Sequence, residues 1–117
     1  EVARPILEKY VPIVDELSSA GWEPITHASC EQPGINIERY GNIKDGKTLF
    51  AVRNVNQEQQ VVSLTLDRKS LGLKERNLEI IEIINGNAVP ASIGSGHVDF
   101  ILEIEPLQTL VVKVTFR

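Results

Sequence analysis

The chain has few of the residues from which metal and redox sites are built. Its 117 residues include no Met, two His, one Trp, two Tyr, three Phe and a single cysteine, Cys30. A lone cysteine excludes an intrachain disulfide, and Cys30 is expected to be a small buried thiol. Together with two histidines it gives at most three zinc ligands, so a four-ligand site would need carboxylates from distant parts of the chain. We therefore predict no metal and no cofactor.

Several motifs and composition signals are also missing. The chain contains no P-loop, no GxGxxG after a strand, no GxSxG, no HExxH and no CxxC. The formal net charge of −4 argues against a nucleic-acid partner, which requires a basic face. No apolar run approaches the roughly 18 residues of a membrane span. These absences predict a chain without a recognisable catalytic constellation, a nucleic-acid partner or a membrane span.

Two alternating runs of apolar and polar residues end the sequence, with Pro106 between them. Because successive side chains of a strand point to opposite faces, this pattern predicts two strands that each bury one side. The length of the chain fits one domain with its own core. The residues predicted to face inward are Val98, Phe100, Leu102, Ile104, Leu110, Val112, Val114 and Phe116.

Shorter alternating segments separated by turn signals fill the middle of the sequence. The segment 78–84 is apolar on both faces and is expected to be a central strand, and Asp67 is expected to cap a short helical turn. Strands that follow one another without intervening helices indicate an antiparallel sheet packing on a second one. The sequence predicts a mainly β fold, an antiparallel β-sandwich of about seven or eight strands. The predicted strands before the last pair lie in 26–29, 35–40, 48–54, 61–66 and 78–84.

The first twenty-one residues have a different periodicity. Tyr10, Val14 and Leu17 recur at helical spacing, and Gly21 suits the left-handed residue that ends a helix. Pro12 is expected to cause a kink or to begin a second helix. We predict an N-terminal amphipathic helix in residues 1–21, packing on the sandwich or on an upstream domain, and a sandwich in 22–117. Since the chain begins at Glu1 without Met, we expect it to be a fragment or a processed product.

Candidate catalytic groups are few. His97 and Asp99 would share one strand face, as ligands or a catalytic pair would, but a solvated strand edge explains them better. Glu103 and Glu105 share an outward face, where carboxylates protect an edge more often than they hydrolyse a glycoside. A stand-alone enzyme using His27 and His97 with nearby carboxylates is therefore the weakest hypothesis, and no catalytic residue is assigned.

A ligand or docking surface has better candidates. Phe50, Phe100 and Phe116 are predicted to lie in the core, which leaves Trp22 and the two tyrosines for a sugar-binding surface. Trp22 follows Gly21, a position where a large ring more often locks a helix onto a sheet. Ile101 and Val111 are predicted on outer sheet faces, where they would form an apolar docking patch unless the helix covers them. The candidate surface residues are Trp22, Tyr10, Tyr40, Ile101 and Val111.

Three segments carry a resemblance to a known architecture: AGWEPITHA (20–28), INIERYG (35–41) and TLFAVRN (48–54). With LEIEPLQTLVVKV near the end, the order of elements resembles the C-terminal region of bacterial glycoside hydrolases and hydrolase-like proteins. In those proteins a (β/α)₈ barrel is followed by a small antiparallel β-sandwich. The resemblance covers nearly the whole chain.

The resemblance implies a non-catalytic accessory domain of a larger carbohydrate-active protein. Catalytic groups of such enzymes lie on the barrel, so none can be assigned to this chain. The implied partner is an upstream catalytic domain of the same polypeptide, which the sandwich would support or dock onto. A carbohydrate-binding module that uses exposed aromatic residues is the alternative. The compartment stays open, with a secreted or periplasmic location as one option.

Overall fold

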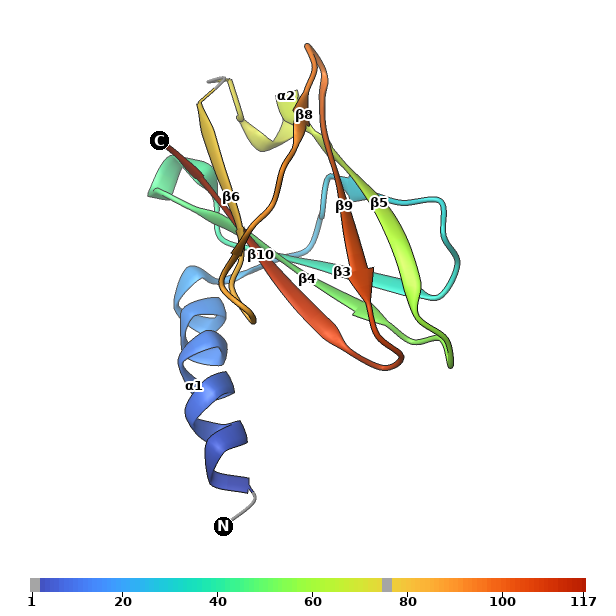
Figure 1. The fold of residues 1–117 in the computed structure, drawn as a ribbon. Coiled ribbons are helices and arrows are strands. Elements are labelled where there is room, and N and C mark those ends of the chain that lie inside the picture. Colours follow the sequence, from blue (N-terminus) through green and yellow to red (C-terminus); the bar gives the residue numbers. More distant parts are fainter. Residues whose placement is uncertain (1–2, 75–76) are drawn as a thin grey trace.

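The protein consists of two antiparallel sheets packed face to face, with one long helix leading away from them (Figure 1). The computed structural model describes residues 3–74 and 77–117. The larger sheet has the order β1-β3-β4-β10-β6-β7 and the smaller one β2-β5-β9-β8. The predicted mainly β sandwich with an N-terminal helix is confirmed. Its ten strands in the described residues exceed the predicted number because three strands of only two residues, β1, β7 and β8, lie outside the predicted segments.

The elements have the following bounds. The helical ones are α1 (Ala3–Ala20), the 3₁₀ helix η1 (Ile43–Asp45) and α2 (Arg68–Leu71). The larger sheet contains β1 (Trp22–Glu23), β3 (Ile35–Tyr40), β4 (Thr48–Asn54), β10 (Thr109–Phe116), β6 (Leu78–Glu82) and β7 (Asn87–Ala88). The smaller sheet contains β2 (Ala28–Ser29), β5 (Gln60–Asp67), β9 (His97–Ile104) and β8 (Ser92–Ile93).

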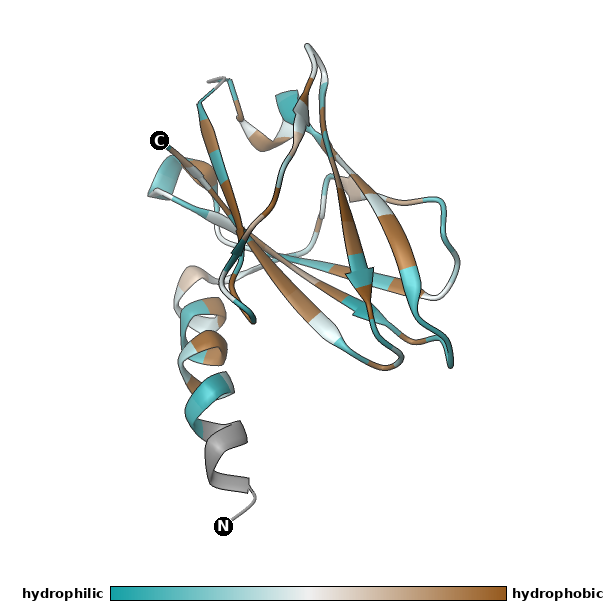
Figure 2. Cartoon of the chain, in the orientation of Figure 1, coloured by the Kyte–Doolittle hydropathy of each residue, from teal (hydrophilic) through white to brown (hydrophobic). Residues whose placement is uncertain are grey.

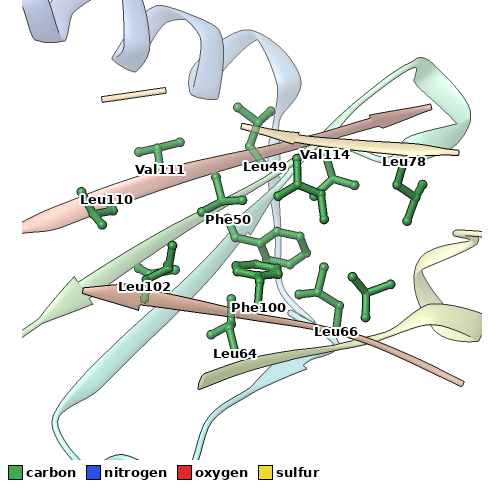
Figure 3. Close-up of a cluster of buried hydrophobic side chains, with 14 of the residues drawn as sticks. Leu49, Phe50, Leu64, Leu66, Leu78, Phe100, Leu102, Leu110, Val111 and Val114 are labelled. Atoms are coloured by element: carbon green, nitrogen blue, oxygen red, sulfur yellow. The ribbon is translucent and has the colours of Figure 1, made fainter. Parts of the chain in front are cut away.

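The last two strands lie in different sheets. β9 pairs with β5 in the smaller sheet, whereas β10 pairs with β4 and β6 in the larger one. The loop around Pro106 therefore crosses from one layer to the other, and the apolar faces of the two strands meet across the core. Figure 3 shows side chains of both layers, among them Phe50 and Phe100, pointing toward each other.

The core follows the alternating pattern read from the sequence. Of the eight inward residues of the last two strands, all except Phe116 are buried, and Phe50 and Phe100 are buried as predicted. Burial of each large apolar side chain stabilises the fold by about 1.5–3 kcal/mol before entropy is subtracted. The prediction for Phe116 is wrong, since its side chain is 39% exposed at the end of β10. Figure 2 shows the hydrophobic residues recurring along the central strands.

β6 is not at the centre of its sheet. It lies between β10 and the two-residue β7, so the expectation of a central strand is wrong, and β4 and β10 hold the middle positions. Its last residue, Glu82, is a buried acid, 4% exposed. The Glu82 carboxylate accepts hydrogen bonds from the backbone N–H groups of Ile84 (2.7 Å), Asn85 (2.9 Å) and Val111 (3.3 Å). This acid fixes the turn that follows β6 and joins that turn to β10.

The short helix α2 begins as its sequence predicts. Asp67 caps it by accepting the backbone N–H of Ser70, and Gly72 ends it with φ 74°. The buried guanidinium of Arg68 donates to the carbonyl oxygens of Leu73 (2.7 Å), Gly94 (2.6 Å) and Lys74 (3.0 Å). Arg68 thereby ties the segment after α2 to the loop between β8 and β9.

Candidate functional site

Helix α1 is the element that stands apart from the sandwich. It runs without interruption from Ala3 to Ala20, so Pro12 does not begin a second helix. Gly21 adopts φ 90° and donates its N–H to the carbonyl of Leu17, which ends the helix as predicted. In Figure 1 the last turns of α1 reach the sheets and its first turns project beyond them. Residues 1–2 of the predicted helical segment lie outside the described residues.

A three-residue ion cluster holds α1 on the larger sheet. Oε2 of Glu16 lies 2.7 Å from Nζ of Lys47 and 2.8 Å from Nζ of Lys113. The hydrogen bond from Lys113, followed by the one from Lys47, lowers the pKa of Glu16 below its usual value of 4.5. Because Val112 and Val114 point into the core, Lys113 points outward, and the helix therefore packs on the outer face of this sheet.

One side of α1 packs on the sandwich and another does not. Ile13 and Leu17 are partly buried and pack against the hydrophobic core. Tyr10, Val11 and Val14 are respectively 38%, 48% and 57% exposed. At 3.6 residues per turn these three side chains fall within about 100° of the helix circumference, beside the Ile13–Leu17 side. The helix therefore has an exposed apolar face, made of Tyr10, Val11 and Val14.

Trp22 lies on the surface, so the expectation that it packs the helix onto the sheet is wrong. Its side chain is 59% exposed, and its Nε1–H donates to Oε2 of Glu38 at 2.6 Å. The reason is local: β1 is a two-residue edge strand that pairs only with β3 among the described residues, so nothing covers the ring. Tyr40, opposite Trp22 on β3, is partly buried and packs against the core.

The predicted patch of Ile101 and Val111 does not form. Ile101 lies on β9 in the smaller sheet and is 63% exposed, whereas Val111 lies on β10 in the larger sheet and is 2% exposed. Val111 and Leu49 share the face of the larger sheet on which α1 packs (Figure 3). The backbone N–H of Ile83 also bonds the Val111 carbonyl, so the turn after β6 lies against this strand. Val111 is therefore excluded from an exposed surface.

The histidines and their neighbouring acids come together at one end of the smaller sheet. His97 pairs with Asp67 across β9 and β5, and the carbonyl of His27 accepts the Asp67 N–H at 2.8 Å. These residues line a shallow depression of about 320 Å³. The Asp67 carboxylate is occupied by Ser70, whose hydroxyl and N–H lower the pKa of Asp67. This acid serves as the cap of α2.

The second acid of this region is occupied as well. Asp99 accepts a hydrogen bond from the Thr65 hydroxyl at 2.7 Å across β9 and β5. In the described part of the chain, no three His, Cys, Asp or Glu side chains are placed to hold a metal ion.

Cys30 is partly buried rather than fully buried, and this burial raises the pKa of its thiol. No helix among the described residues is long and apolar enough to cross a membrane.

Comparison with known proteins relates the chain to glycoside hydrolase structures. No protein-family model and no curated protein matches it. Two structures of a GH27 β-L-arabinopyranosidase from Geobacillus stearothermophilus, one a variant in complex with arabinose and one wild type, are 18% identical to it. They match 77% and 75% of this chain with TM-scores of 0.52 and 0.50. A protein provisionally assigned as an α-N-acetylgalactosaminidase from Bacillus halodurans matches 83% with a TM-score of 0.56 and 13% identity.

These matches concern a small part of the larger proteins. The chain spans about a fifth of their length, with 20%, 19% and 22% of each structure covered. At this level of identity the likeness concerns the fold. The resemblance drawn from the sequence is confirmed at that level: the chain has the fold of a small β-rich part of GH27 glycoside hydrolases.

Proposed function

We propose that the chain is a non-catalytic accessory domain at the C-terminal side of a larger, carbohydrate-active protein. Residues 22–117 form its sandwich, and residues 1–21 form the segment that joins it to an upstream catalytic domain. The observation that carries this proposal is the exposed apolar face of α1, made of Tyr10, Val11 and Val14, on a helix whose first turns lie beyond the sandwich. The likeness to about a fifth of each GH27 structure supports it.

The docking surface is the exposed face of α1. Covering an apolar helix face of this kind with a second domain removes apolar surface from water and so stabilises the protein. The opposite side of α1 is already fixed to the larger sheet by Glu16, Lys47 and Lys113, so the helix presents its free face in one orientation. The role of this domain is to support the catalytic domain that contacts that face.

The longer gene product tests the proposal. The reading frame upstream of Glu1 should encode a barrel-sized domain, and calorimetry of the two-domain protein should show that the two domains unfold together. Val14→Lys should uncouple the two transitions, because it places a charge in the docked face. Val61→Lys is the matched control, since Val61 on β5 is 55% exposed against 57% for Val14.

Two results would contradict the proposal. One is an upstream reading frame without a domain of barrel size. The other is an equal effect of Val14→Lys and Val61→Lys on the coupling of the two transitions, which would mean that the face of α1 makes no specific contact.

A further inference from the structure

The surface around Trp22 has a feature that the proposed support role does not explain, namely an exposed aromatic ring held in a fixed orientation. An exposed tryptophan normally samples several ring orientations, but the 2.6 Å hydrogen bond from Nε1 to Glu38 holds this ring in one position. The hydrogen bond uses the edge of the indole, and the side chain remains 59% exposed. A ligand that stacks on the ring would therefore not need to immobilise it first, which reduces the entropic cost of binding.

Polar side chains continue from Glu38 along the same face of the larger sheet. Asn36 lies two residues from Glu38 along β3, about 7 Å away, and so shares its face. Arg53 is directly opposite Asn36 on β4, about 5 Å away. Asn36, Glu38 and Arg53 are all exposed. Ala51, which lies opposite Glu38, has a short side chain that does not fill the surface between them. We call Trp22, Glu38, Asn36 and Arg53 the Trp22 platform.

We propose that the Trp22 platform binds a pyranose sugar. Pyranoses combine an apolar face of C–H groups, which suits an aromatic ring, with adjacent hydroxyls around the rim. Planar carboxylate, amide and guanidinium groups can each bond two neighbouring hydroxyls, as donors, acceptors or both. This site is independent of the docking of α1, so either proposal can fail while the other stands.

Other ligands with flat or charged parts fit the platform less well. A nucleotide could stack on Trp22, but the Glu38 carboxylate beside the ring would repel its phosphates, and the chain carries a net charge of −4. A protein partner would cover more of the surface, and it would need an apolar patch wider than one ring. One ring on an open sheet face predicts weak binding of a sugar, with a Kd of about 1 mM.

The experiment uses the 117-residue chain, cellotetraose and galactotetraose as probes, and sorbitol as a polyol without a ring. We expect the fluorescence of the only tryptophan to shift when a sugar that binds is added, and the shift should saturate as the sugar concentration rises. Sorbitol should cause no shift. Saturation-transfer NMR then measures binding in variants. Trp22→Ala should abolish the signal, and Glu38→Gln should weaken binding about tenfold because a charge-assisted hydrogen bond is lost.

The control variant is Ile101→Ala, which removes an equally exposed apolar side chain from the opposite sheet and should leave binding unchanged. Thermal unfolding of each variant checks that the fold is retained. The proposal is overturned if neither sugar binds, if sorbitol gives the same shift, or if binding survives Trp22→Ala. Protection of Trp22 by a protein partner, without any sugar binding, would assign the platform to a protein contact and would also overturn it.

Discussion

The ion cluster at Glu16 permits a quantitative test of how α1 is held. Glu16→Gln keeps the shape of the side chain but removes the charge that Lys47 and Lys113 share. Ion pairs at a protein surface contribute about 0.2–1 kcal/mol each. The Glu16 side chain is only 23% exposed and both lysines approach the same oxygen, so we expect a total loss of about 1–1.5 kcal/mol. For a domain of this size this corresponds to a fall in Tm of about 3–6 °C.

The pH dependence of the same variant has a definite sign. The pKa of Glu16 in the folded protein is lowered below its usual value of 4.5, so its stabilising contribution is complete above the unfolded pKa. That contribution is lost as the pH falls through the folded pKa. The difference in unfolding free energy between wild type and Glu16→Gln should therefore be full at pH 7 and should vanish in acid.

Urea denaturation at a series of pH values measures this difference. Asp15→Asn is the matched control, because Asp15 is an exposed acid next to Glu16 on the same helix. A double-mutant cycle with Lys113→Met isolates the interaction between Glu16 and Lys113. Equal effects of Glu16→Gln and Asp15→Asn at pH 7, or a difference that persists in acid, would refute the reasoning.

Three further predictions concern the sandwich and are all measured by urea denaturation. Arg68→Lys should cost about 2–3 kcal/mol, since a lysine cannot reach the carbonyls of Leu73, Gly94 and Lys74 together; exposed Lys69→Met should cost little. Glu82→Ala should cost about 3 kcal/mol because it leaves buried N–H groups of Ile84 and Val111 without their acceptor, and a loss under 1 kcal/mol would mean that water replaces it. Phe100→Ala should cost about 3–5 kcal/mol and Phe116→Ala about 1 kcal/mol, given that they are 3% and 39% exposed, and equal losses would contradict these burials.

Local patterns were sufficient to predict the strands but not their neighbours. The alternation in the last twenty residues depends only on which side each residue faces, and it identified seven buried residues correctly. Whether β9 and β10 pair with each other or face each other across the core depends on strands far away in the sequence. Both arrangements bury the same residues, so the pattern cannot distinguish them. The misplaced central strand has the same origin, because order within a sheet is a long-range property.

The candidate surface was harder to predict for a related reason. Val111 and Trp22 are both on β-strands of the larger sheet, and the elements that pack beside each strand decide their exposure. The helix and the turn after β6 cover the face near Val111, whereas the two-residue β1 leaves Trp22 uncovered. Exposure on the outer face of a sheet depends on which element packs there, and the sequence of the strand alone does not contain that information.

The positions of the two proposed surfaces have a joint consequence. The free face of α1 and the Trp22 platform lie on the same side of the sandwich, because Lys113, Tyr40 and Glu38 share the outer face of the larger sheet. A catalytic domain that contacts α1 would therefore stand beside the platform rather than across the sandwich from it. A sugar held at Trp22 would then lie close to that domain. Since the platform binds the sugar with this chain's own side chains, Val14→Lys should separate the unfolding transitions of the two-domain protein and should leave sugar binding at Trp22 unchanged.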